Sequence, residues 1–193
     1  MAQLLPELIE GPRFTLRRWE AGDANAMARA VERNIDHLRP FMPWIADEPL
    51  APARRLALLI SWEQAWSLGG DVILGAFGVD DDDVVGSCGL HRRRGPHALE
   101  LGYWVDKDHL GQGIGTEMAR LLTIAAFGVP GVTATEIHHD KANVASGRIA
   151  QRLGYSFIGE TPRSVTGAVA APGEIGVDWG WRMVNSGAAG FSS

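Results

Sequence analysis

Residues 101–117 read LGYWVDKDHLGQGIGTE, an apolar run that passes through a short polar loop into glycines at positions 111, 113 and 115. The apolar run closes a strand-like stretch, 98–105, and from Gly113 to Phe127 the apolar side chains recur with helical spacing. Glycines allow the backbone N–H groups of the turn to converge, and the first N–H groups of the new helix lack partners. The segment therefore predicts a strand, an anion-binding turn suited to a phosphate or pyrophosphate, and a helix.

Two common phosphate loops are excluded by the residues themselves. A Walker A loop requires a lysine after the last glycine, and none follows here. A Rossmann fingerprint requires a glycine three residues after the second one, where Thr116 or Met118 stands. The alternative is that the glycines only permit a tight turn, although three at alternate positions exceed what one turn needs.

The rest of the chain alternates strand-like and helical patterns. Short connections between 72–79, 84–90 and 98–105 predict an antiparallel meander. Pro40, Pro43 and Pro49 predict turns within 36–50, and Gly, Ala and Pro predict a loop over 161–176. Further strands are expected at 14–19, 132–138, 155–158 and 177–184, and helices at 24–31, 52–68, 113–127 and 143–153. We predict an α+β, sandwich-like fold with a mixed, mostly antiparallel sheet flanked by helices, as one domain over 1–185 with a flexible tail at 186–193.

The composition excludes several classes of protein and of binding site. The 193 residues suit one domain, and glycine, at 24 residues, is the one strong excess. A net charge of -5 argues against a nucleic-acid partner, and no apolar stretch is long enough for a membrane span. Cys88 is the single cysteine, so an internal disulfide or a cysteine-rich zinc site is excluded. His138 and His139 are neighbours on an expected strand and point to opposite faces, so no metal is expected. We expect a cytoplasmic protein.

Several motifs together resemble the GNAT superfamily of acyl-CoA N-acyltransferases. They are YWV at 103–105, GQGIGT at 111–116, NVAS at 143–146, QRLGY at 151–155 and LRPFMPW at 38–44. The last motif is typical of the RimJ/RimL-type branch, which acetylates protein N-termini. The resemblance covers roughly 13–184 and implies a GNAT fold, splayed between its fourth and fifth strands (98–105 and 132–138). It also implies acetyl-CoA as co-substrate and no metal.

The resemblance implies where the co-substrate lies. The pyrophosphate would bind the N–H groups of the glycine turn, and the pantetheine arm would pair with the strand before it like an added strand. Leu110 stands where relatives carry a polar side chain. The cofactor-binding residues expected on this basis are Tyr103, Trp104, Val105, Gly111, Gln112, Gly113, Ile114, Gly115, Thr116, Asn143 and Ser146.

The implied chemistry is direct attack of an amine on the thioester. A base must help to deprotonate the amine, and Glu100 is the one carboxylate inside 98–105; an exposed strand glutamate is the alternative. The resemblance implies Ser146 as the proton donor to the leaving thiolate, with Tyr155 as the alternative. Many relatives use a tyrosine slightly later in this helix, but this chain has Ile149 and Ala150 there. The alternative is that Asn143 caps a helix and Ser146 is simply its first-turn residue.

The acceptor cleft is the last part of the expected site. Phe41, Met42 and Trp44 lie among prolines and are expected to line the acceptor cleft. The alternative is that they pack into the hydrophobic core. The first expectation is a protein or peptide N-terminal α-amine. The second expectation is a small amine such as an aminoglycoside or polyamine. The alternative of another class is a non-catalytic module that binds acyl-CoA as a sensor or merely forms a homodimer.

Overall fold

The computed structural model describes residues 5–79, 83–166 and 170–186, so the predicted tail lies outside the described residues apart from Ser186. Within the described part, eight strands form one sheet in the order β1-β2-β3-β4-β5-β6-β8-β7. The strands are β1 (Leu8–Glu10), β2 (Phe14–Arg18), β3 (Val72–Gly78), β4 (Val84–His91), β5 (Ala98–Val105), β6 (Ala134–Asp140), β7 (Ser156–Pro162) and β8 (Val177–Val184). The predicted α+β class with a mixed, mostly antiparallel sheet is confirmed.

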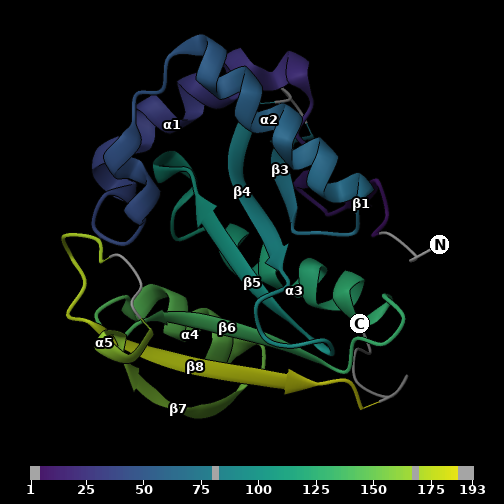
Figure 1. Cartoon of the computed structure of the whole chain (residues 1–193), viewed down its shortest axis with the longest axis vertical. Helices are drawn as coiled ribbons and strands as arrows, with labels where there is room; N and C mark the ends of the chain where they lie inside the picture. The colour runs from purple at the N-terminus through teal and green to yellow at the C-terminus, as the bar shows by residue number, and fades with distance from the viewer. Residues whose placement is uncertain (1–4, 80–82, 167–169, 187–193) are drawn as a thin grey trace.

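The sheet opens between β5 and β6, its one parallel pair. Parallel neighbours need a crossover, and helix α3 (Ile114–Phe127) supplies it. The ladder pairs Ala98–Leu101 with Ala134–Ile137 and ends there, although both strands continue. Figure 1 shows the two strands diverging into a V. The predicted splay is therefore confirmed, and Gly102 is the first residue of β5 beyond the ladder.

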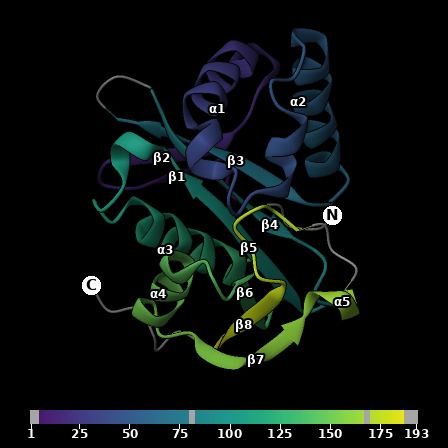
Figure 2. The ribbon, with the colours of Figure 1, turned by 90° about the vertical axis from the view of Figure 1, so that its left-hand side faces the viewer.

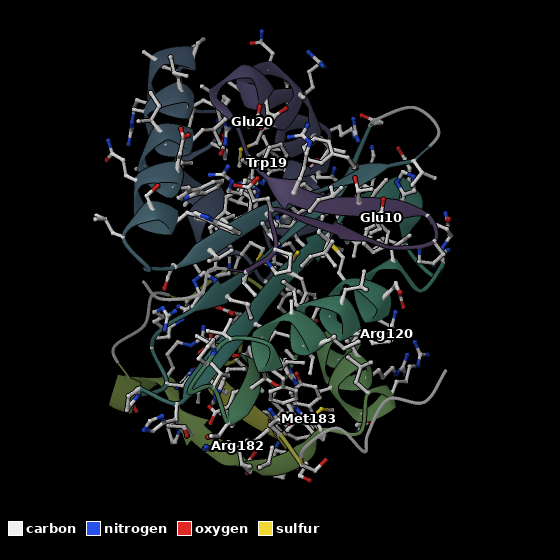
Figure 3. The ribbon with its side chains drawn as sticks, turned by 90° about the vertical axis from the view of Figure 1, so that its right-hand side faces the viewer. Glu10, Trp19, Glu20, Arg120, Arg182 and Met183 are labelled. Atoms are coloured by element: carbon white, nitrogen blue, oxygen red, sulfur yellow. The ribbon has the colours of Figure 1, made fainter. Side chains whose placement is uncertain are left out.

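Helices cover both faces of the sheet (Figure 2). On one face lie α1 (Ala24–Leu38) and α2 (Pro52–Ser67), over a core cluster that contains Trp19, Phe77 and Trp104. On the other lie α3 and α4 (Val144–Arg152), over the larger core cluster. Figure 3 shows Trp19 between the α1/α2 layer and the sheet, whereas Arg182 and Met183 lie at the far end of the molecule. The short helices are η1 (Ala21–Asp23), η2 (Pro43–Asp47), η3 (Lys107–His109) and α5 (Arg163–Thr166).

Some boundaries differ from those predicted. Helix α1 runs to Leu38 instead of ending at residue 31, because Arg33 and Asn34, which look like a polar end, reach across to Asp106. Strand β1 was not predicted, and the stretch expected to be a loop over 161–176 contains α5 and the end of β7. No helix in the described ranges is long and apolar enough to cross a membrane.

Candidate active site

The glycine-rich turn follows β5 at the open end of the V. Gly111 and Gly113 have φ values of 72° and 81°, in the left-handed region that glycine adopts without strain. Gly113 is the N-cap of α3, and no described side chain caps this helix end. The first helical bond runs from the Glu117 N–H to the Gly113 carbonyl, which leaves the N–H groups of residues 114–116 for an anion. The start of α3 therefore offers N–H donors to an anion, and a pyrophosphate at this point stays a prediction.

Gly115 serves a different purpose from the other two glycines. Its backbone is helical and buried, and a Cβ there would stand 3.0 Å from Ile149 Cδ1 and 3.2 Å from Val105 Cγ2. The absence of a side chain thus lets α3 approach both β5 and α4 closely. Gly111 and Gly113 shape the turn, whereas Gly115 sets how near the helix start lies to the open strands.

A buried carboxylate anchors the loop between β5 and the glycine turn. Asp106 accepts hydrogen bonds from Arg33 Nε and Asn34 Nδ2 of α1, both at 2.6 Å, and from the Asp108 N–H at 2.9 Å. Asn34 also accepts from the Lys107 N–H at 2.7 Å. This anchor was not predicted from the sequence, although an aspartate directly after a strand and before a short helix is a capping signal.

The anchor predicts a pH-dependent contribution to stability. Burial alone would raise the pKa of Asp106, but the hydrogen bonds from Arg33 and Asn34 outweigh it, so its pKa lies below the ordinary value. Stabilisation from a lowered pKa is present when the pH lies above the pKa of the carboxyl in the unfolded protein, about 3.9. It is lost as the pH falls through the lower pKa of the folded protein. Asp106→Asn should lower the free energy of unfolding in urea by about 1.5–3 kcal/mol at pH 7, and by less below about pH 4. The exposed Asp108→Asn is the control; an equal loss for Asp106→Asn at both pH values contradicts the charge argument.

Two hydroxyl groups meet across the V on the α3/α4 side. The Asn143 side chain accepts a hydrogen bond from the Ser146 N–H at 3.2 Å, so the predicted cap of α4 is confirmed. This fixes Ser146 in the first turn, where its Oγ lies 3.0 Å from Tyr103 Oη. Burial raises the pKa of Tyr103, so its hydroxyl stays protonated throughout the physiological range. Ser146 as donor to the thiolate stays a prediction, and the structure places a second hydroxyl beside it.

Tyr155, the other donor considered, lies in the core. Its ring is 4% exposed, and its hydroxyl lies 2.7 Å from Thr123 Oγ1 and 2.8 Å from Thr135 Oγ1. Both partners are themselves buried. The hydroxyl is therefore occupied within the α3 side of the sheet, and the geometry favours Ser146.

Glu100 lies inside β5 with its side chain only 10% exposed. Its carboxylate is bonded by Arg94 Nε at 2.5 Å and lies 3.3 Å from Arg93 Nε. These contacts could not be predicted from the local sequence pattern, because Arg93 and Arg94 lie on the turn before β5 and meet Glu100 only when the strand folds beside them. Glu100 as the base stays a prediction, but two guanidinium groups already hold its carboxylate.

The predicted acceptor segment lies between α1 and α2. Trp44 is 38% exposed, Phe41 and Met42 are half-buried, and Met42 packs against the core cluster of the α1/α2 face. Met42 thus shares in the core, whereas Trp44 remains open to solvent. Just before them, the Pro40 carbonyl accepts a hydrogen bond from the Gly173 N–H at 2.9 Å.

Gly173 belongs to a strap, residues 170–176, that leads into β8. A Cβ on Gly173 would stand 2.7 Å from Pro40 Cβ, so only glycine allows this contact. Figure 2 shows the strap rising from β8 toward the α1/α2 layer. Asp140 holds its far end by accepting from the N–H groups of Ile175 and Gly176, and Glu174 of the strap pairs with Arg163. The strap and the segment after Pro40 therefore form one continuous rim.

The two histidines of β6 point to opposite faces, as predicted. His139 is buried, with Nδ1 bonded to the Asp140 carbonyl and Nε2 accepting from Trp181 Nε1. His138 bonds Glu136 at 2.7 Å on the other face. Among the described residues, no three His, Cys, Asp or Glu side chains are grouped to hold a metal ion.

Comparisons with known proteins agree with this geometry. YjcK, a probable N-acetyltransferase of Bacillus subtilis strain 168, is 24% identical over 160 residues, 82% of this chain and 88% of the relative. The structure of RimL, a ribosomal L7/L12 α-N-protein acetyltransferase in complex with coenzyme A, matches with a TM-score of 0.79 at 19% identity, over 92% of this chain and 98% of RimL. The microcin C7 self-immunity acetyltransferase MccE, in complex with acetyl-CoA and AMP, matches with a TM-score of 0.79 at 16% identity, over 90% of this chain and 93% of MccE.

The predicted resemblance is thereby confirmed at the level of family and fold. The structural matches show the fold alone, and RimL and MccE differ in their described roles. A model of the acetyltransferase (GNAT) domain matches residues 13–156, well over half of the 193 residues. The chain therefore belongs to the GNAT acetyltransferase family and is an acetyl-CoA-dependent N-acetyltransferase.

Proposed function

We propose that this enzyme acetylates the α-amine at the N-terminus of a protein or peptide, by direct attack on acetyl-CoA in a ternary complex. The observation that carries the proposal is the contact between Pro40 and Gly173. It joins the strap to the predicted acceptor segment and closes one side of the acceptor face. A rim closed in this way favours an N-terminus as the acceptor, because a free chain end can enter the cleft end-on. A lysine that projects from a folded surface is less suited to it.

Acetyl-CoA fits the opening between β5 and β6. The free N–H groups at the start of α3 suit the pyrophosphate, and the edge of β5 beyond Leu101 offers backbone groups to the pantetheine arm. On this arrangement Tyr103, Trp104 and Val105 line the arm. Ser146, with Asn143 behind it, lies where the thiolate leaves.

The chemistry of the acceptor agrees with an α-amine. With a pKa of about 7.7–8.0, its deprotonation at pH 7 costs about 1 kcal/mol, against about 4–5 kcal/mol for a lysine amine of pKa about 10.4. Such a substrate therefore needs only a modest base. The reaction requires acetyl-CoA and the N-termini of newly synthesised proteins, so we place the enzyme in the cytoplasm.

A panel of acceptors tests the proposal by thiol release. Peptides with a free N-terminus should be acetylated, with the product mapped to the α-amine by mass spectrometry. The same peptides with a formylated N-terminus and an internal lysine are the matched control and should react at least about 100-fold more slowly. Activity confined to aminoglycosides or polyamines would overturn the N-terminal acceptor, and tight acetyl-CoA binding without turnover on any amine would overturn catalysis.

A further inference from the structure

A histidine–aspartate pair stands over the point where β5 and β6 part. His91 ends β4, and its Nδ1 lies 2.7 Å from Asp71 Oδ2. The other oxygen of Asp71 accepts the Arg92 N–H at 2.8 Å, so the carboxylate is held on both sides. Burial alone would raise the pKa of Asp71, but the hydrogen bonds from the Arg92 N–H and from His91 bring it below the ordinary value. An ionised carboxylate only accepts, so Nδ1 carries the hydrogen; a neutral imidazole held in this way has the lone pair on Nε2.

Gly102 makes room for that ring, with Gly89 beside it. Gly89 and Gly102 face each other in the β4–β5 ladder. His91 Nε2 lies 3.2 Å from where a Cβ on Gly102 would stand and 3.5 Å from the same point on Gly89. Apart from Gly102 itself and its two chain neighbours, no described atom outside the His91 ring comes within 4 Å of that point on Gly102. Nε2 therefore lies beside the backbone of Gly102, and the His91 side chain is 18% exposed.

The same point is where the thioester belongs if acetyl-CoA binds as proposed. The pyrophosphate site follows β5, so the arm runs from the open end of the V toward its vertex. The vertex is fixed by the last ladder pair, Leu101 with Ile137, and Gly102 is the next residue of β5. Tyr103 and Ser146 approach from the α3/α4 face, whereas His91 approaches from the face that carries the strap and Trp104.

We propose that His91 is the catalytic proton acceptor for the amine and that Asp71 is its positioning residue. R–NH3⁺ gives one proton to His91 Nε2, and the freed lone pair forms the C–N bond with the thioester carbonyl. The C–S bond then breaks with its electron pair on sulfur. Ser146 gives its proton to the thiolate, the nitrogen loses its second excess proton, which restores the Ser146 hydroxyl, and His91 returns its proton to solvent. The proposal rests on acetyl transfer at this site and holds for any amine acceptor.

Two other groups on this face are less suited. The Glu100 carboxylate is held by Arg93 and Arg94. His138 uses its Nε2 on Glu136, and its ring leans toward Gly180 of β8, whose added Cβ would lie 3.0 Å from Cε1. The charged or titratable groups around His91 are Asp71 before β3, Arg92, Arg93 and Arg94 of the β4–β5 turn, Glu100 of β5, and Glu136 and His138 of β6.

Kinetics of matched variants test the proposal with the best acceptor found in the panel. His91→Asn keeps an amide that can donate to Asp71 but removes Nε2. We expect kcat/KM at pH 7 to fall about 100-fold or more, while the Kd for acetyl-CoA by calorimetry stays within about twofold. The acid limb that His91 adds to the pH profile of kcat/KM should vanish and leave the limb of the amine. Asp71→Asn should lower kcat/KM by less than His91→Asn does, and it should shift the acid limb of the pH profile.

His97→Asn, on the β4–β5 turn, is the control and should leave both constants unchanged. A loss under threefold for His91→Asn with an unaltered pH profile would overturn the proposal, as would full loss in Glu100→Gln beside an active His91→Asn. Unchanged acetyl-CoA affinity and far-UV circular dichroism separate a missing base from a misfolded variant. Since the acceptor panel is scored separately, failure of the N-terminal assignment leaves this test intact.

Discussion

Gly113→Trp is expected to abolish acetyl-CoA binding, with an affinity at least about 100-fold weaker by calorimetry. Gly113 caps α3 at a φ of 81°, and a side chain there would stand in front of the free N–H groups of the first turn. Hydrogen bonds to a charged group contribute about 1.5–3 kcal/mol each. The loss of two exceeds the roughly 2.8 kcal/mol that a 100-fold change requires. Activity should fall in parallel at sub-saturating acetyl-CoA.

A second glycine provides the matched control. Gly131 has a φ of 84°, and a Cβ there would meet nothing within 4 Å, so Gly131→Trp introduces the same backbone strain outside the turn. Both variants should lose similar stability, and only Gly113→Trp should lose acetyl-CoA. Intact binding by Gly113→Trp would show that the pyrophosphate does not lie at the start of α3.

The sequence predicted the elements near the glycine turn well because their signals are local. Strand 98–105, the turn and the helix that follows it are each encoded by neighbouring residues, and β5 has the predicted bounds. The purposes of the glycines are not encoded locally. Gly115 is required by the approach of Ile149 from α4, and Gly102 accommodates a ring from β4. Periodicity cannot reveal contacts that arise only when distant segments fold together.

The candidate site shows the same division. The cap of α4 could be predicted because Asn143 and the Ser146 N–H lie three residues apart, whereas the role of both residues in the site rests on the resemblance. Asp106 was missed because its partners, Arg33 and Asn34, come from α1, more than 70 residues earlier. His91 was missed because its partner Asp71 lies 20 residues away in another strand connection. A lone histidine at a strand end carries no chemical signal until the sheet supplies its neighbours.

Ser146→Ala is expected to lower kcat about 100-fold and to leave the Kd for acetyl-CoA nearly unchanged. The departing thiolate, with a thiol pKa of about 8.5, leaves more readily when a hydroxyl gives it a proton. Tyr103→Phe keeps the ring in place and removes only the hydroxyl that lies 3.0 Å from Ser146 Oγ. It should lower kcat by about tenfold, because Ser146 keeps its own proton but loses its partner.

The pH dependence distinguishes a proton donor from a packing residue. Above the pKa of the thiol the thiolate is a stable leaving group, so the ratio of wild-type to Ser146→Ala kcat should shrink between about pH 7 and pH 9.5. Ser61→Ala is the control, because Ser61 is an exposed helical serine that bonds only the Leu58 carbonyl among its described contacts, and its kcat should not change. A ratio that stays constant across this range would assign Ser146 to the cap of α4 alone. The thiolate would then take its proton from the attacking amine, and Tyr103→Phe would have no effect on kcat.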